Sequence, residues 1–189
     1  GVCDQMYLFE PGDDTTVCVL KAVKPKKVKL FTGPPSHKED DAKVVHELMT
    51  NADIRIVSGG TTSQIVAREL GVEVKSSTEI YDKEVPPIAY IHGINLVTEG
   101  VLTLSKTIDR LKSLSKSLDS NIFKAKDGAS QMAKLLYSAS HIKLLVGRSL
   151  NIANAEISFQ RDLELRLHVI GELEKILVKL GKIVTIEYY

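Results

Sequence analysis

The stretch IRIVSGGTTSQIVARELG, residues 54–71, predicts a strand, a turn and a helix in immediate succession. The run from Ile54 to Val57 is short and rich in β-branched residues, which is typical of a buried strand. The small and polar residues 58–62 turn the chain into a helix whose apolar face carries Ile65, Val66 and Leu70. A strand followed directly by a helix is the repeating unit of α/β domains, so this stretch indicates the fold class.

The same alternation continues on both sides of this stretch. Further strand-like runs occupy Val28 to Phe31, Ile88 to Ile91, Ile142 to Val146 and Ile183 to Ile186, and a shorter one is suggested by Val72 and Val74. Helical spacing of apolar residues fills most of the chain between them. The strand runs are mainly apolar rather than alternating with period two, which favours a mostly parallel sheet covered on both faces. We therefore expect an α/β fold, specifically a three-layer α/β/α sandwich with a mostly parallel, Rossmann-like sheet.

Capping residues mark where several of these helices should begin. A hydroxyl or carboxylate at the first position, with Glu or Gln three residues later, satisfies backbone N–H groups that have no acceptor inside the helix. The expected caps are Ser36 with Glu39, Thr61 with Gln64, Thr98 before the helix at about 101–118, and Asp127.

Composition excludes several classes of function. Lys and Arg together number 25 and Asp and Glu number 24, so no net field would attract nucleic acid or an acidic membrane surface. The sequence contains no apolar run of about 18 residues, so we expect no membrane span. Cys3 and Cys18 are too few for a disulfide framework, and a reducing cytoplasm is the expected location.

Four loops should meet at one edge of the sheet. In a parallel sheet, every loop that leaves a strand for a helix emerges at the carboxyl edge, where ligands bind. The loops that follow the expected strands are Thr32 to Pro35, Ser58 to Thr62, His92 to Gly100, and Gly147 to Asn151.

The glycines and charged residues of these loops are the candidate ligand-binding residues. Gly59 and Gly60 would let backbone N–H groups approach an anion, and the adjacent helix N-terminus would add positive potential. Alternatively, these glycines only form a tight turn whose cap is Thr61. The carboxylate of Glu99 could accept from a ligand hydroxyl or amine, or it could simply compensate the helix dipole. The candidate set from the first three loops is Gly33, Gly59, Gly60, Thr61, Thr62 and Glu99.

The last loop adds Gly147, Arg148 and Asn151 to this set. An arginine beside a backbone cradle suits phosphate or carboxylate, although surface ion pairing explains it equally well. The five histidines have no metal-binding spacing, and no serine lies in a G-x-S-x-G motif. The sequence therefore indicates ligand binding and gives no catalytic residue.

The N-terminal stretch has a different chemistry. Asp13 and Asp14 precede the strand-like run Val17 to Val23, and adjacent carboxylates suit a hard cation such as Mg²⁺ or Mn²⁺. The alternative is an ordinary Asp-rich turn. We expect the strand-like run to pair with this domain's sheet or with a neighbouring molecule, since an unpaired strand exposes its backbone polar groups.

The order Gly12-Asp13-Asp14-x-Thr16-Val17-x-Val19 resembles the closing motif of SpoIIE-like bacterial metal-dependent (PPM-type) serine/threonine protein phosphatases. The resemblance implies that Asp13 ligates Mn²⁺ or Mg²⁺ with Asp14 as its companion, in a site that needs further motifs from an upstream region. The glycine-bearing loops and the C-terminal Glu187-Tyr188-Tyr189 are similar to an extension found in some of these bacterial signalling proteins. The resemblance implies that residues 1–23 are the tail of a phosphatase domain and residues 24–189 an accessory domain. The weak helical periodicity and two lysines of residues 119–126 separately indicate a hinge between the two halves of the accessory domain.

Two functions are compatible with these observations. The favoured one is a regulatory domain of a SpoIIE-like phosphatase that binds a small anionic ligand at the strand edge and contacts the preceding phosphatase domain. The alternative is a stand-alone α/β enzyme of phosphotransfer or hydrolase type. In the favoured case this chain is inactive as a hydrolase and needs no cofactor of its own, and a homodimer is compatible with it.

Overall fold

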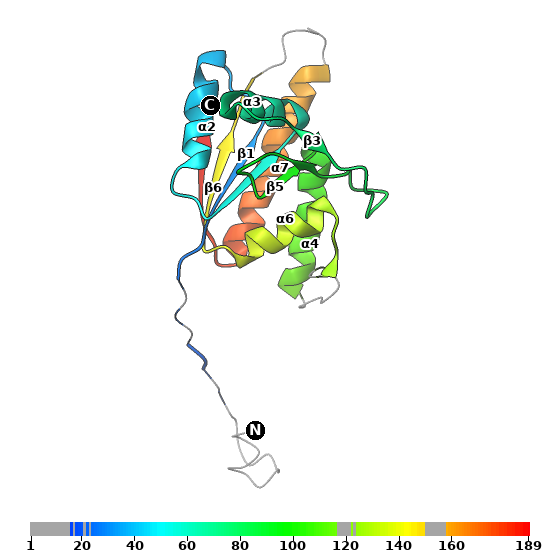
Figure 1. Cartoon of the computed structure of the whole chain (residues 1–189). Coiled ribbons are helices and arrows are strands. Elements are labelled where there is room, and N and C mark those ends of the chain that lie inside the picture. Colours follow the sequence, from blue (N-terminus) through cyan, green and yellow to red (C-terminus); the bar gives the residue numbers. More distant parts are fainter. Residues whose placement is uncertain are drawn as a thin grey trace.

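The computed structural model describes residues 16, 18–20, 22, 24–116, 122, 124–149 and 158–189 (Figure 1). Its sheet consists of β1 (Lys27–Thr32), β2 (Ile54–Ser58), β3 (Lys75–Ser76), β4 (Ala89–Tyr90), β5 (Leu96–Thr98), β6 (His141–Val146) and β7 (Ile183–Tyr188). The helices are the 3₁₀ turn η1 (Lys38–Asp40), α2 (Asp41–Met49), α3 (Gly60–Leu70), α4 (Val101–Lys116), α6 (Gly128–Ser138) and α7 (Ser158–Lys179).

The sheet is mixed but mostly parallel, which confirms the α/β class. Its strand order is β3-β4-β5-β2-β1-β6-β7. The strands β1, β2, β5, β6 and β7 pair in parallel, whereas the two-residue strands β3 and β4 add antiparallel partners at one edge. From β1 the chain first builds toward β5 and then returns to place β6 on the other side of β1. The order therefore reverses between β1 and β6.

Helices pack against both faces of this sheet. Successive residues of a strand point to opposite faces, and β1 shows this alternation. Leu30 is buried in a cluster with residues of α4, α6 and α7, whereas its neighbour Phe31 is buried in a second cluster with residues of α2 and α3. Burial on both sides explains why the strand runs are mainly apolar instead of alternating strictly between apolar and polar residues.

One of the expected caps is confirmed and three are wrong. The carboxylate of Asp127 accepts from Ser130 N at 2.9 Å and caps α6. Ser36 does not cap α2, because its N–H and hydroxyl both donate to the carbonyl of Tyr189, at 3.2 and 3.3 Å. A 3₁₀ turn therefore comes first, and α2 follows Asp40 without a side-chain cap.

The other two wrong caps lie where the chain is already paired with a neighbour. Thr61 is inside α3, whose N-cap is Gly59, because Gly59 N donates to the carbonyl of Thr98 at 2.9 Å and fixes the turn two residues earlier. Thr98 is the last residue of β5 and pairs with Ser58 in β2. Both differences are tertiary contacts that local capping patterns do not report.

The expected loop His92 to Gly100 contains β5, which the sequence analysis missed. This strand has three buried residues, and its pairing with β2 rather than any length of apolar sequence holds it in the sheet. The strand expected at Val72 and Val74 is displaced to Lys75–Ser76, and only two residues of the run Ile88 to Ile91 are in β4.

The N-terminal predictions fall largely outside the described residues. Asp13 and Asp14 lie outside them, as does half of the proposed hinge at 119–126. Of the expected strand at 17–23, residues 18–20 and 22 are described and belong to no strand. Val19 and Leu20 are 83% and 93% exposed. Within the described part of this stretch, the alternative in which it pairs with this domain's sheet is therefore wrong, and pairing with a neighbouring molecule stays a prediction.

Candidate functional site

Three of the four predicted loops, and the end of the remaining one, meet at the carboxyl edge of the sheet. Backbone hydrogen bonds join them in a row: Gly59 N donates to Thr98 O at 2.9 Å, and Gly147 N donates to Thr32 O at 3.0 Å. Gly33 N donates to the hydroxyl of Thr62 at 3.0 Å, which ties the loop after β1 to the first turn of α3.

The loop from His92 to Asn95 does not share this edge. Asn95 N donates to Arg55 O, and Arg55 N donates to Asn95 Oδ1, so this segment lies near the amino end of β2. The intervening strand β5 carries the chain across the sheet. Only Glu99 and Gly100, which follow β5, reach the predicted edge.

A pocket of about 170 Å³ opens at this edge beside α3. It lies between the first turns of α3, the end of β5 and the two short antiparallel strands. The carbon-rich part of its lining includes Val97 and Ile88. The polar part consists of Gly60, Ser63, Gln64, Ser76, Thr98 and Glu99.

Glu99 is the charged residue of this pocket. A β-carbon built on Gly60 would lie 3.9 Å from Glu99 Oε2, so the carboxylate stands beside the first residue of α3. The hydroxyls of Ser58 and Thr98 donate to the backbone carbonyl of Glu99, at 2.9 and 3.0 Å, and hold the residue at the strand end. Among the described residues, no side chain donates a hydrogen bond to the Glu99 carboxylate, which is exposed at the pocket mouth.

The predicted residues of the Gly-Gly-Thr-Thr turn have different roles. Gly60 lines the pocket. Gly59 precedes the helix and accepts from Ser63 Oγ at 2.8 Å. Thr62 is buried and its hydroxyl accepts from Gly33, whereas Thr61 is exposed. The turn thus supplies one pocket residue and one link to the loop after β1.

Arg148 lies on the same edge but at a different place. Its guanidinium carbon is 4.1 Å from the ring centroid of Tyr188, which is a cation–π contact. The backbone N–H of Arg148 donates to Tyr189 O at 2.8 Å. Gly147 is buried against the loop after β1. Asn151, the last predicted residue of this loop, lies outside the described residues.

Sequence reasoning missed Ser63, Gln64 and Ser76 as pocket residues. Ser63 was assigned only to a helix and Gln64 to a capping box with Thr61, yet both lie in the first turns of α3, where side chains next to a strand edge can face a ligand. Ser76 belongs to β3, whose pairing with β4 no local pattern indicates.

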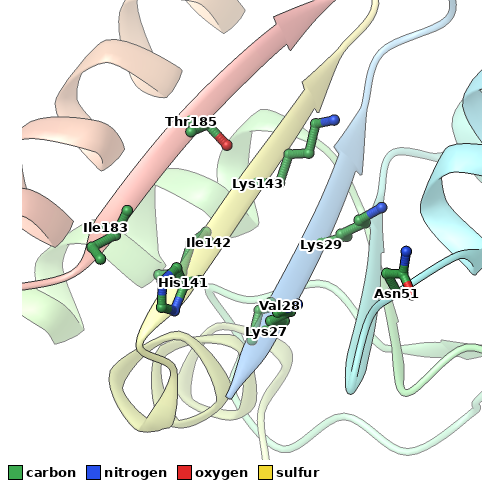
Figure 2. A pocket seen from close by; sticks show the side chains of 9 residues that line it. All are labelled: Lys27, Val28, Lys29, Asn51, His141, Ile142, Lys143, Ile183 and Thr185. Atoms are coloured by element: carbon green, nitrogen blue, oxygen red, sulfur yellow. The ribbon is translucent and has the colours of Figure 1, made fainter. Parts of the chain in front are cut away.

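A second pocket, of about 200 Å³, lies on the sheet face at the amino ends of β1, β6 and β7 (Figure 2). The strand register places Lys29, Lys143 and Thr185 side by side across these three strands. Figure 2 shows both lysine side chains projecting from the same face of the sheet. The remaining lining residues are Lys27, Val28, Asn51, His141, Ile142 and Ile183.

Two of the charged residues that line this second pocket, Lys29 and Lys143, are paired with carboxylates. Lys29 and Lys143 both donate to Glu47 Oε1 of α2, at 2.6 and 2.8 Å, and Lys143 also lies 2.6 Å from Glu187 Oε2. Hydrogen bonds from Lys143 and then from Lys29 lower the pKa of Glu47, and hydrogen bonds from Lys143 and from Tyr189 lower the pKa of Glu187. Burial and the Glu187 carboxylate raise the pKa of Tyr189.

No protein-family model, curated protein or solved structure matches the chain. Within the described ranges, no group of three or more His, Cys, Asp or Glu side chains is placed to hold a metal ion. No helix of the described part is both long and apolar enough to cross a membrane.

Proposed function

We propose that residues 24–189 form a regulatory domain that binds a small anionic ligand at the carboxyl ends of β2 and β5. The observation that carries the proposal is the 170 Å³ pocket in which Glu99 and Gly60 meet at the start of α3. We further propose that the domain is a Rossmann-like three-layer α/β/α sandwich, because helices pack on both sides of a sheet whose strand order reverses beside β1.

The pocket offers two complementary kinds of contact. The first N–H groups of a helix have no acceptor within it, so the start of α3 favours an anionic group. The carboxylate of Glu99 favours a hydroxyl or amine on the same ligand. Val97 and Ile88 can pack against its nonpolar part. A phosphorylated or carboxylated metabolite that also carries hydroxyls or an amine combines these features.

In this proposal, the domain lies C-terminal to a SpoIIE-like serine/threonine phosphatase domain in a cytoplasmic bacterial signalling protein. It is supported by the order of glycine-bearing motifs and by the Asp13-Asp14 pair. In the parent enzyme, Asp13 would hold Mn²⁺ or Mg²⁺ together with residues from the preceding region. Ligand binding to the regulatory domain would change how it contacts the phosphatase domain. A homodimer is compatible with this arrangement.

The test is a thermal-shift panel of nucleotides and phosphorylated metabolites on the chain of residues 1–189. We expect one class of compound to raise the melting temperature, and Glu99→Gln to weaken its binding about tenfold, or about 1.4 kcal/mol, because a charge-assisted hydrogen bond is lost. Glu172→Gln, on the surface of α7, serves as the control and should leave binding unchanged. If no compound shifts the melting temperature, or if Glu99→Gln binds as the wild type does, the proposed site is wrong.

The second candidate is a stand-alone phosphotransfer or hydrolase enzyme. It is favoured by the unpaired carboxylate of Glu99 in a pocket, since such a group can act as a base. The described pocket lining includes no histidine, cysteine or lysine to act with it, which favours the regulatory function. Incubation with phosphoserine peptide or aryl phosphate and Mn²⁺ or Mg²⁺ should give no turnover. Turnover that disappears in Glu99→Gln would establish the enzyme instead.

A further inference from the structure

The place where the strand order reverses lies between β1 and β6, away from the Glu99 pocket. The loop after β1 begins at Gly33 and leads to α2, whereas the loop after β6 begins at Gly147 and leads toward α7 on the other face of the sheet. In open parallel sheets, the divergence of two such loops forms the position at which ligands characteristically bind.

At this position the two loops are in direct backbone contact. A β-carbon on Gly147 would lie 2.1 Å from Pro34 O and 2.2 Å from Gly33 O, so only glycine fits there. Ser149 N donates to Pro34 O at 3.0 Å and fastens the second loop to the first. The contact fixes the positions of both loops without using a charged side chain.

Arg166, from α7, reaches the same contact. Its Nη1 lies 3.4 Å from Gly147 O, and a β-carbon on Gly33 would lie only 2.6 Å from Nη1. The guanidinium therefore lies against the glycine of each loop. Gly33 has φ +78°, a conformation that side chains rarely adopt, which keeps this approach open.

The guanidinium is half-buried and poorly satisfied by its described neighbours. Burial lowers the pKa of Arg166, and Asp162, one turn earlier on α7, raises it. An arginine has five N–H donors and remains charged in proteins. Its one hydrogen bond within the described part of the chain, to Gly147 O at 3.4 Å, is longer than the usual N–H···O distance. A partly desolvated cation with spare donors is stabilised by an anion.

We propose that Arg166 is the anion-binding residue of a site at the β1–β6 reversal, and that the site takes a phosphate group. The planar fork of an arginine matches two oxygens of a phosphate or carboxylate, which a lysine cannot do. Arg148 shares the edge but stacks on Tyr188 and is exposed, so it is the matched comparison. The proposal stands whether or not the Glu99 pocket binds a metabolite.

The test uses the chain of residues 1–189 with inorganic phosphate, pyrophosphate and citrate, each against sodium chloride at the same ionic strength. Isothermal titration should show saturable binding of phosphate or pyrophosphate. Arg166→Gln should weaken it at least tenfold and Arg166→Lys by an intermediate factor, because the paired hydrogen bonds are lost while the charge is kept. Arg148→Gln should bind within twofold of the wild type.

A second measurement needs no variant, so it tests the site even if an Arg166 variant does not fold. In the ¹⁵N spectrum of the wild type, the Arg166 Nε–H resonance should move with added phosphate along the same saturation curve, and should not move with chloride. Tighter binding of citrate than of either phosphate would overturn the choice of phosphate. Absence of saturable binding, an unmoved Arg166 resonance, or equal losses in the Arg166 and Arg148 variants would overturn the site itself.

The same samples separate this proposal from the proposed function. Glu99→Gln should bind inorganic phosphate as the wild type does. Phosphate binding without any response to the metabolite panel would overturn only the Glu99 pocket. A Glu99-dependent metabolite response without phosphate binding at Arg166 would overturn only the present inference.

Discussion

The pockets at the two ends of the parallel strands differ in whether their charged side chains are paired. On the sheet face beside the amino-end pocket, Lys29 and Lys143 are neutralised by Glu47 of α2 and by Glu187, which lies nearer the carboxyl end of β7. At the carboxyl edge, Glu99 accepts no side-chain hydrogen bond from the described residues. Toward the same described residues, Arg166 donates one long hydrogen bond, to a carbonyl. Both ends carry a pocket, and the larger of these two pockets lies over the paired charges.

The difference separates structural charges from candidate binding charges. When a ligand displaces one partner of an existing ion pair, the stabilisation of that pair is lost. An unpaired charge at a rigid strand end instead gains an interaction when the ligand binds. Pocket size alone would select the amino-end pocket. Charge pairing selects the carboxyl edge, in agreement with where parallel sheets bind ligands.

The largest expected effect tests whether the carboxyl edge is rigid. Gly147→Ala should destabilise the domain by about 3 kcal/mol, because its β-carbon would collide with the backbone of Gly33 and Pro34. Gly171→Ala is the control: it has open space on α7 and should stabilise the domain by up to about 1 kcal/mol. Urea denaturation of both variants measures the two changes. Equal stability of Gly147→Ala and the wild type would show that the two loops are not held in contact.

The next effect tests the paired charges directly. Glu47→Gln should cost about 2 kcal/mol, because it leaves Lys29, whose side chain is 9% exposed, without its carboxylate. The same denaturation experiment on Glu172→Gln should show no measurable change, since Lys175, its partner, is on the surface. If Glu47→Gln leaves the free energy of unfolding unchanged, the network is solvated like an ordinary surface ion pair.

Acid should weaken the same network. The pKa values of Glu47 and Glu187 are lowered below the ordinary 4.5, so their contribution to stability is present above the unfolded-state pKa and is lost as pH falls through the folded-state values. Between pH 5 and pH 3 the wild type should lose on the order of 1 kcal/mol more than Glu47→Gln does. Melting temperatures of both proteins across this range measure the difference, and parallel curves would contradict it.

The smallest effect is expected at Glu99. Glu99→Gln should change the free energy of unfolding by less than about 0.5 kcal/mol, because no side-chain bond of the described residues depends on its carboxylate. Chemical denaturation without ligand gives this value. A loss as large as that of Glu47→Gln would assign Glu99 a structural role and remove the contrast between the two ends.

Local pattern was sufficient for elements that are long or strongly apolar. The runs from Val28 to Phe31 and from Ile142 to Val146 predicted β1 and β6, since each is largely buried and is apolar except for one lysine, Lys29 or Lys143. Asp127 predicted its helix start because its capping bond lies within four residues of sequence. These features depend on neighbours along the chain.

Pattern failed where a distant segment decides the local structure. Ser36 was expected to cap a helix, but the carbonyl of Tyr189, at the other end of the chain, accepts both of its donors. β5 was missed because three residues carry little periodicity and become a strand by pairing with β2. Of the predicted site residues, Gly60 and Glu99 line the pocket, whereas the guanidinium of Arg148 stacks on the ring of Tyr188.

By itself, the sequence determined the α/β class, most of the strands, and the glycine-bearing loops with Glu99 among them, because apolar runs and turn residues act over a few neighbouring positions. Only the tertiary structure decided the strand order, the pairing of Lys29 and Lys143 with Glu47, and the approach of Arg166 to Gly33 and Gly147. Those features join residues far apart in the chain, and whether a charge is paired or spare depends on which of them fold together.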